Sequence, residues 1–183
     1  KPKLGIVTTG KSYMDVRQAL DELGIDEVKA ADLGIRLLKV AMVWPLDPKI
    51  VETFAEGLDM IMVVEEKRSL LEVQVREELY NLPHHPILIG KEDEQGEMLF
   101  PPYGALDPNH IALEIGKRLG RLHATLDDDL KARMEQLAAL QRNVRNQPDL
   151  ISRIPYFCAG CPHNSSTVLP EGARGYAGIG CHW

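Results

Sequence analysis

The sequence predicts an α/β fold in which a mostly parallel sheet carries helices on both faces, followed by a long helix and an irregular, cysteine-rich tail. Strand-like and helix-like segments alternate regularly through residues 1–122, which is typical of parallel βαβ units. Residues 60–64 form a continuous apolar run, as expected for a strand covered on both faces. From residue 153 onward charged side chains become rare, and Gly, Pro, Ser and Cys replace them.

Four short segments are predicted as strands because they are apolar and rich in β-branched residues. They cover residues 4–9, 37–44, 60–64 and 86–89. Gly10 closes the first segment and Pro45 stops the second.

Helices are predicted between and after these strands. Ser12 with Asp15 resembles a capping box that opens the first helix, and a single apolar stripe follows, made of Val16, Ala19, Leu20 and Leu23. Asp47-Pro48 and Asp107-Pro108 open two further helices, since proline is well placed in a first turn. The inner face of the helix after Pro48 is predicted to carry Ile50, Val51, Phe54 and Leu58. Residues 69–80 form another amphipathic segment, and the helix after Pro108 runs through Leu122.

Residues 125–145 predict a long amphipathic helix with no strand after it. Thr125-Leu-Asp-Asp128 resembles a capping box. Apolar residues follow at spacings of three and four: Leu126, Leu130, Met134, Leu137, Leu140 and Val144. Two interpretations remain open. The helix packs against its own or the next domain, or it forms a dimerising coiled coil, for which three heptads is short.

The composition narrows the class of protein. The chain has 183 residues, is 44% hydrophobic and 26% charged, and can bury a normal globular core. Its net charge of −6 and the lack of a basic cluster argue against nucleic acid or an anionic membrane as partners. No apolar run approaches the roughly 20 residues that cross a bilayer. An odd number of cysteines with a CxxC and no secretion signal favours a reducing, cytoplasmic location and a metal or redox role.

One nucleotide-binding motif is present but is rejected. Gly5-Ile-Val-Thr-Thr-Gly10-Lys11-Ser12 matches the phosphate-loop pattern GxxxxGKS/T. In a phosphate loop the strand precedes the first glycine, and the backbone between the glycines turns its amides toward the phosphate. The residues between these two glycines are all β-branched and belong in an extended strand. We therefore expect no nucleotide site at this position.

The cysteines carry the strongest chemical signal. Cys158 and Cys161 form a CxxC, and Cys181 follows downstream. Thiolates bind soft metals, and a CxxC lets two of them reach one metal or cluster from a single turn. Three interpretations compete: a zinc knuckle completed by His182, a thioredoxin-type redox pair, or an iron–sulfur cluster with a fourth ligand farther along a longer polypeptide.

The same segment resembles a known enzyme family. Pro155-Tyr-Phe-Cys-Ala-Gly-Cys-Pro-His163, followed by Gly178-Ile-Gly-Cys181-His182, is similar to the opening of the thiamine-diphosphate-binding domain of indolepyruvate ferredoxin oxidoreductases. Residues 1–122 resemble the transketolase-C-terminal-like domain of such enzymes, through Leu4–Gly10, Trp44-Pro45-Leu46 and Val63-Val-Glu-Glu66. The resemblance covers essentially the whole chain.

The resemblance implies an activity and its cofactors. Such enzymes oxidatively decarboxylate indolepyruvate and other arylpyruvates to acyl-CoA, and pass the electrons through a 4Fe–4S cluster to ferredoxin. The expected cofactors are thiamine diphosphate with Mg²⁺ and the cluster, and the expected partners are a 2-oxo acid, CoA and ferredoxin in a homo- or hetero-oligomer. By motif match Cys158, Cys161 and Cys181 are cluster ligands, while His163, Gly180 and His182 lie near the thiamine diphosphate. The alternative for His163 is a histidine that bonds a backbone carbonyl near the metal.

The chain is expected to be an internal piece of such an enzyme. Its parts are a transketolase-C-terminal-like domain over residues 1–122, a linker helix over 123–152 and an incomplete start of the thiamine and iron–sulfur domain over 153–183. We expect the piece alone to be inactive, and no catalytic residue is assigned within it. The alternative is a stand-alone interaction or regulatory domain with a zinc knuckle.

Two further pairs of titratable residues give weaker indications of function. His84-His85 is expected to be a solvated turn, because adjacent side chains point in different directions. Glu65-Glu66 follows a predicted strand at the usual ligand edge of a doubly wound sheet, and an interface role is expected there.

Overall fold

The computed structural model describes residues 3–146 and 157–176. The chain divides into two compact units, residues 1–145 and residues 146–183. Within residues 3–146 the first unit contains a four-stranded sheet whose strand pairs are all parallel. The strands β1 (Leu4–Thr9), β2 (Ile35–Val40), β3 (Met60–Val64) and β4 (Ile87–Ile89) lie in the order β2-β1-β3-β4. The predicted α/β class with a parallel sheet is therefore confirmed.

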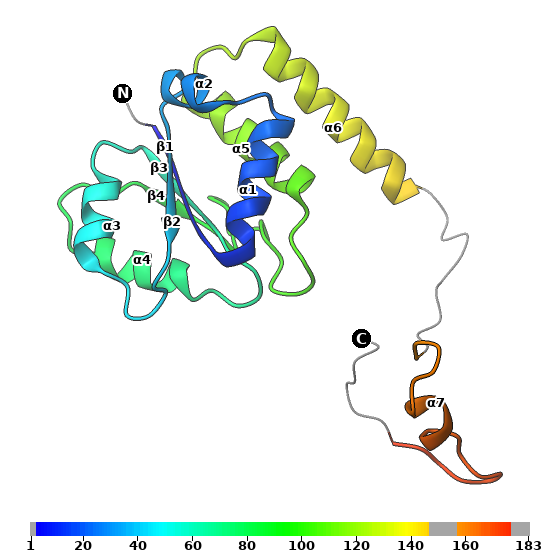
Figure 1. The fold of residues 1–183 in the computed structure, drawn as a ribbon. Helices are drawn as coiled ribbons and strands as arrows, with labels where there is room; N and C mark the ends of the chain where they lie inside the picture. Colours follow the sequence, from blue (N-terminus) through cyan, green and yellow to red (C-terminus); the bar gives the residue numbers. More distant parts are fainter. Residues whose placement is uncertain (1–2, 147–156, 177–183) are drawn as a thin grey trace. The chain divides into compact units, whose positions relative to one another are not determined.

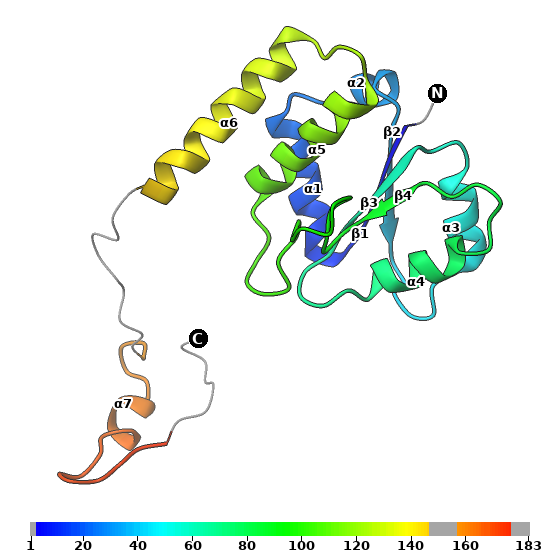
Figure 2. The same ribbon diagram turned by 180° about the vertical axis from the view of Figure 1, so that it is seen from behind.

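Helices cover both faces of this sheet (Figure 1). On one face lie α1 (Gly10–Glu22), α2 (Glu27–Asp32) and α5 (Pro108–Leu122). On the other lie α3 (Pro48–Ala55) and α4 (Leu71–Leu79). The view from behind shows the same two layers with the sheet between them (Figure 2).

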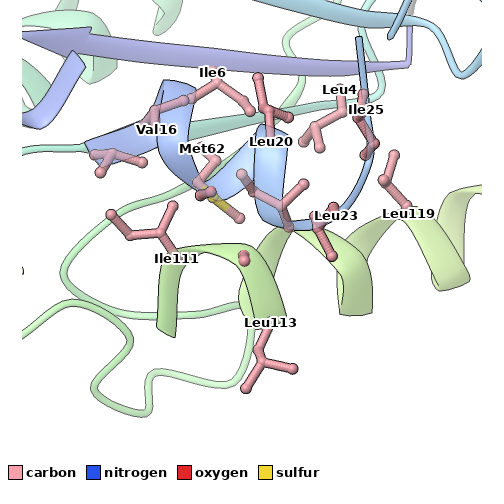
Figure 3. Close-up of a cluster of buried hydrophobic side chains, with 14 of the residues drawn as sticks. Leu4, Ile6, Val16, Leu20, Leu23, Ile25, Met62, Ile111, Leu113 and Leu119 are labelled. Carbon is pink, nitrogen blue, oxygen red and sulfur yellow. The ribbon is translucent and has the colours of Figure 1, made fainter. Parts of the chain in front are cut away.

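Two apolar cores follow from the alternation of side chains along the strands. Leu4, Ile6 and Met62 point toward α1 and α5 and pack against leucine, isoleucine and valine side chains of these helices (Figure 3). Val7 and Val63 belong to the core under α3 and α4. All five residues of β3 are buried, which is why its sequence is a continuous apolar run rather than an alternating one.

The second strand and one helix differ from the prediction. β2 covers residues 35–40 rather than 37–44, because it pairs with β1 from Leu4 opposite Ile35 to Thr9 opposite Val40. β1 ends at Thr9, so the apolar residues after Val40 have no neighbour to pair with. The short α2 was not predicted, and its cap is Asp26, which accepts a hydrogen bond from the backbone N–H of Lys29 at 2.8 Å.

The helix starts at Asp-Pro pairs were predicted correctly. Asp47 and Asp107 each cap their helix by accepting a hydrogen bond from a backbone N–H two residues later, at 3.0 Å. The capping box at Ser12 was wrong, because α1 begins at Gly10 and Ser12 is buried inside the helix.

The apolar face of α3 differs in part from the prediction, and α4 buries only some of its apolar residues. In α3, Val51 and Phe54 are buried with Leu58 just beyond the helix, but Ile50 is exposed. In α4 the buried apolar residues are Leu71, Val75 and Leu79, whereas Leu70 and Val73 are exposed.

The long helix α6 (Asp128–Asn146) packs on the rest of the first unit through its N-terminal part. Leu130 and Leu137 are buried in the apolar core that also contains residues of α1 and α5. Leu140 and Val144, farther along, are 55% and 72% exposed. This supports the interpretation of α6 as a helix packed on its own domain. The cap is Asp127 rather than Thr125, since Asp127 accepts from the N–H of Leu130 at 2.7 Å.

In the second unit, residues 157–176 form turns and the short helix α7 (His163–Ser166). Phe157 and Cys161 are partly exposed, and every other residue of this segment is exposed. In the described parts of the chain, every helix is too short or too polar to cross a membrane.

Candidate functional site

Cys158 and Cys161 lie on one tight turn. The backbone N–H of Cys161 donates to the carbonyl oxygen of Cys158 at 3.0 Å. Gly160, the third residue of the turn, has a φ of +79°, the conformation that a type II turn requires at this position and that glycine adopts without strain. Both thiols are free. The turn therefore brings two unpaired sulfur donors to one short stretch of backbone, as the CxxC pattern predicts.

Asn164, a residue of α7, links this turn to the helix by hydrogen bonds. Its side-chain Nδ2 donates to the carbonyl oxygen of Cys158 at 3.0 Å, and its backbone N–H donates to the carbonyl oxygen of Cys161 at 3.1 Å. Pro162 stands at the N-cap of α7. Asn164 was missed as a site residue. The only indication of its role in the sequence is that it is an asparagine close to the CxxC.

His163 contacts a cysteine sulfur. Its Nδ1 lies 3.2 Å from Sγ of Cys161. Its ring stacks on Phe157, with ring centroids 5.1 Å apart and an interplanar angle of 24°. The sequence suggested a thiamine contact or a bond to a carbonyl for this histidine, and neither the sulfur contact nor the role of Phe157 was foreseen.

The other predicted site residues, Gly180, Cys181 and His182, lie outside the described residues. The grouping of three cysteines and the contacts to thiamine diphosphate therefore stay predictions. Within residues 3–146 and 157–176, no three His, Cys, Asp or Glu side chains gather in a way that could hold a metal ion. His84 and His85 are both exposed, as expected for a solvated turn.

The carboxyl edge of the sheet is the usual ligand crevice in such folds, at the point where neighbouring strands connect in opposite directions. In this chain that point lies between β1 and β3. Nζ of Lys11 sits 2.8 Å from Oδ2 of Asp15 and 3.2 Å from Oε1 of Glu66. Hydrogen bonds to Asp15 and then to Glu66 raise the pKa of Lys11, so the ammonium stays charged and paired with the chain's own carboxylates.

The phosphate-loop motif is a strand in the structure. The residues from Leu4 to Thr9 are extended in β1, so the segment between the two glycines forms no phosphate-binding loop. A Cβ at Gly5 would lie 2.5 Å from Cδ1 of Leu58 and 2.8 Å from Cε1 of Phe54. The close packing of α3 and the following turn on the sheet therefore explains why position 5 is a glycine.

Glu65 has a structural role instead of the expected interface role. It is 5% exposed, and its carboxylate accepts hydrogen bonds from the backbone N–H groups of residues 70, 71 and 72 at the start of α4. Nζ of Lys91 donates to the carbonyl oxygen of Glu65 at 2.5 Å, and burial lowers the pKa of Lys91. Lys11, Glu65 and Glu66 at this edge are all paired within the chain. The CxxC segment is therefore taken as the candidate site.

Comparison with known proteins identifies relatives of the chain. The sequence model of a family described as "Indolepyruvate oxidoreductase domain" matches residues 1–144. The chain is 28% identical over 185 aligned residues to the indolepyruvate oxidoreductase subunit IorA of Pyrococcus abyssi, covering 98% of this chain and 25% of that protein. It is 25% identical to the subunit of the same name from Thermococcus kodakarensis, with the same two coverages. The chain thus spans about a quarter of the length of the curated relatives it matches.

Two solved structures show weaker likeness. A 2-oxoglutarate:ferredoxin oxidoreductase from Magnetococcus marinus matches with a TM-score of 0.44 and 17% identity, over 65% of this chain and 18% of that one. An inactive β4 tetramer of a split-gene transketolase matches with a TM-score of 0.43 and 21% identity, over 66% of this chain and 39% of that one.

Proposed function

Because this chain belongs to the indolepyruvate oxidoreductase family, we propose that it is part of a thiamine-diphosphate-dependent enzyme that oxidatively decarboxylates indolepyruvate and related 2-oxo acids to acyl-CoA. The electrons pass through a 4Fe–4S cluster to ferredoxin in this proposal. The observation that carries it is the placement of two free thiols, Cys158 and Cys161, on a single turn. A cytoplasmic, reducing location agrees with unpaired cysteines.

The sulfur donors fit an iron–sulfur cluster. Cluster iron is held by cysteine thiolates, and the turn from Cys158 to Cys161 presents two of them at the surface of the segment. We propose Cys181 as the third ligand. The chain has three cysteines, so a fourth cysteine ligand must come from outside it. That is consistent with a chain that covers about a quarter of its relatives.

The thiamine diphosphate is proposed to lie near His163, Gly180 and His182. When bound with Mg²⁺, this cofactor supplies the nucleophilic carbon that makes decarboxylation of a 2-oxo acid possible. Nδ1 of His163 already contacts Cys161, so a contact from this histidine to the cofactor would be made by Nε2. The role of these residues is to position the cofactor beside the cluster.

The α/β unit is proposed to be a scaffold. Its carboxyl edge, where such folds usually bind ligands, is occupied by Lys11, Glu65 and Glu66 in contacts within the chain. We propose a scaffold over residues 1–122, a linker helix over 123–152 that also packs on the scaffold through Leu130 and Leu137, and the start of the cofactor domain over 153–183. The 2-oxo acid, CoA and ferredoxin then meet the complete oligomeric enzyme, and this chain alone is inactive.

Metal analysis of the complete enzyme tests the proposal. Anaerobically purified enzyme is expected to be brown and to contain iron and acid-labile sulfide. Cys161→Ser should lose most of that iron and the electron transfer to ferredoxin, because a ligand is removed. Ser166→Ala, an exposed change in the same segment, should keep both.

Two results would contradict the proposal. A colourless enzyme with one zinc per chain would favour the zinc knuckle and a non-catalytic role. Reduction of an electron-accepting dye by the isolated 183 residues, dependent on a 2-oxo acid, would show that the chain needs no further domains.

A further inference from the structure

We propose that His163 is a positioning residue of the cluster, which donates its Nδ1–H to the sulfur of Cys161 and thereby raises the cluster's reduction potential. This inference rests on the proposed function, because it assumes that Cys161 is a cluster ligand. It assigns to His163 a contact that the motif did not indicate.

The chemistry of a cluster ligand sets the direction of the hydrogen bond. Nδ1 of His163 and Sγ of Cys161 are 3.2 Å apart. A cysteine bound to iron is a thiolate with no proton, so its sulfur can only accept. The ring must then carry its proton on Nδ1 to make this contact, and the hydrogen bond of one ring nitrogen fixes the tautomer.

The ring is held in place by its immediate neighbours in the chain. Phe157, which precedes the first cysteine, stacks on the imidazole at 5.1 Å between centroids. The hydroxyl of Thr167 donates to the backbone carbonyl of His163. These contacts all lie within residues 157–167, so the donor is fixed to the same short segment as the sulfur it faces.

The effect on the cluster follows from charge. A 4Fe–4S cluster becomes more negative when it takes up an electron, and a donor aimed at a ligand sulfur stabilises the more negative form. Hydrogen bonds to the sulfurs are among the factors that set the potentials of such clusters. His163 therefore favours the reduced cluster, which is the state that must form when the 2-oxo acid is oxidised.

Two substitutions separate the hydrogen bond from the packing of the ring. His163→Phe keeps an aromatic ring to stack on Phe157 but removes the N–H donor. His163→Asn removes the ring but keeps an N–H at nearly the same distance from the backbone as Nδ1. A purely structural role for the ring predicts that Asn is the more damaging change, whereas the donor role predicts that Phe is.

The measurement is a redox titration of the cluster in the complete enzyme, followed by electron paramagnetic resonance. We expect His163→Phe to titrate at a lower potential, with the reduced-to-oxidised ratio at a fixed potential falling about tenfold, which is 59 mV for one electron. His163→Asn should stay close to the wild type. Equal potentials in the wild type and in the Phe variant would overturn the inference.

A second measurement covers the case in which the Phe variant loses its cluster. Wild-type enzyme labelled with ¹⁵N-histidine should show a hyperfine coupling from one histidine nitrogen to the reduced cluster, and His163→Asn should abolish that coupling. Its absence from the wild type would also overturn the inference. A wild-type enzyme without iron would instead contradict the proposed function, so the two failures are distinguishable.

Discussion

Glu65 and Leu71 are joined by a hydrogen bond of 2.9 Å between a buried carboxylate and the backbone N–H that opens α4. The same carboxylate accepts from the N–H groups of Leu70 and Glu72 at 3.0 and 3.1 Å. The first N–H groups of a helix have no partner within it, and this end of a helix favours negative charge. In this chain a carboxylate from the end of β3 takes the position that a bound phosphate takes at other helix N-termini.

Replacing Glu65 should destabilise the fold. Glu65→Ala leaves buried N–H groups without an acceptor, and we expect a loss of about 3 kcal/mol in the free energy of unfolding. Urea denaturation of the chain measures it. The neighbouring Glu66→Ala removes a more exposed ion pair with Lys11 and should cost below about 1 kcal/mol. Similar costs for the two variants would show that Glu65 does not cap α4.

Alanine substitutions at Gly5 and Gly120 should have opposite effects on the stability of the fold. A Cβ at Gly5 would lie 2.5 Å from Cδ1 of Leu58 in the core, whereas a Cβ at Gly120 would lie an ordinary 3.6 Å from Cδ1 of Leu126. We expect Gly5→Ala to destabilise by about 1–3 kcal/mol through overpacking. Gly120→Ala, inside α5, should be neutral or stabilising by up to about 1 kcal/mol, because alanine favours helix. Thermal unfolding of both variants tests this, and a harmless Gly5→Ala would contradict the packing explanation.

Two leucines of α6 should differ in their contribution to stability. Leu137 is 5% exposed and Leu140 is 55% exposed. Leu137→Ala should cost about 2–4 kcal/mol, because it opens a cavity in the core, while Leu140→Ala should cost below about 1 kcal/mol. Denaturant midpoints of the two variants decide the matter. If Leu140→Ala were the costlier change and the cost depended on protein concentration, the coiled-coil interpretation of α6 would be favoured instead.

Asp127 should give the start of α6 a dependence on pH. Its pKa is lowered by the hydrogen bond from the N–H of Leu130 and then by Lys29. A carboxylate with a lowered folded-state pKa stabilises the fold above its unfolded pKa of about 3.9, and this contribution is lost as the pH falls through the folded pKa. Asp127→Asn keeps an acceptor but does not titrate.

The unfolding free energies of wild type and Asp127→Asn should therefore differ most near pH 7 and converge below about pH 4. Chemical denaturation at several pH values measures this difference. Asp127→Glu, which keeps a carboxylate on a longer side chain, should retain a dependence on pH. A gap between wild type and the Asn variant that stays constant down to pH 3 would exclude the ionised carboxylate as its source.

The sequence predicted best those elements whose ends are determined locally. The bounds of β1, β3 and α5 agree with the prediction, because a glycine, a buried apolar run and an Asp-Pro pair mark them. β2 was predicted too far along the chain, because its length depends on pairing with β1. The rejection of the phosphate loop agrees with the structure because β-branched residues favour an extended backbone wherever they occur.

The candidate site was predictable to a similar extent. Gly160 between the cysteines indicates a turn with a positive φ, and the structure has it. The partner of His163 was not predictable, because which atom the imidazole faces depends on how α7 turns back on Cys161. Phe157 and Asn164 could not be singled out for the same reason, since their contacts cross the turn.

By itself, the sequence determined the α/β class, the two apolar faces of the central strand and the presence of paired thiols, because residue type and spacing carry these directly. Only the tertiary structure decided that Glu65 caps α4, that Leu137 is buried while Leu140 is exposed, and that His163 contacts a cysteine sulfur. Each of these three features depends on a second segment or turn that folding places next to the residue. The distance in space between two such groups does not follow from their spacing along the chain.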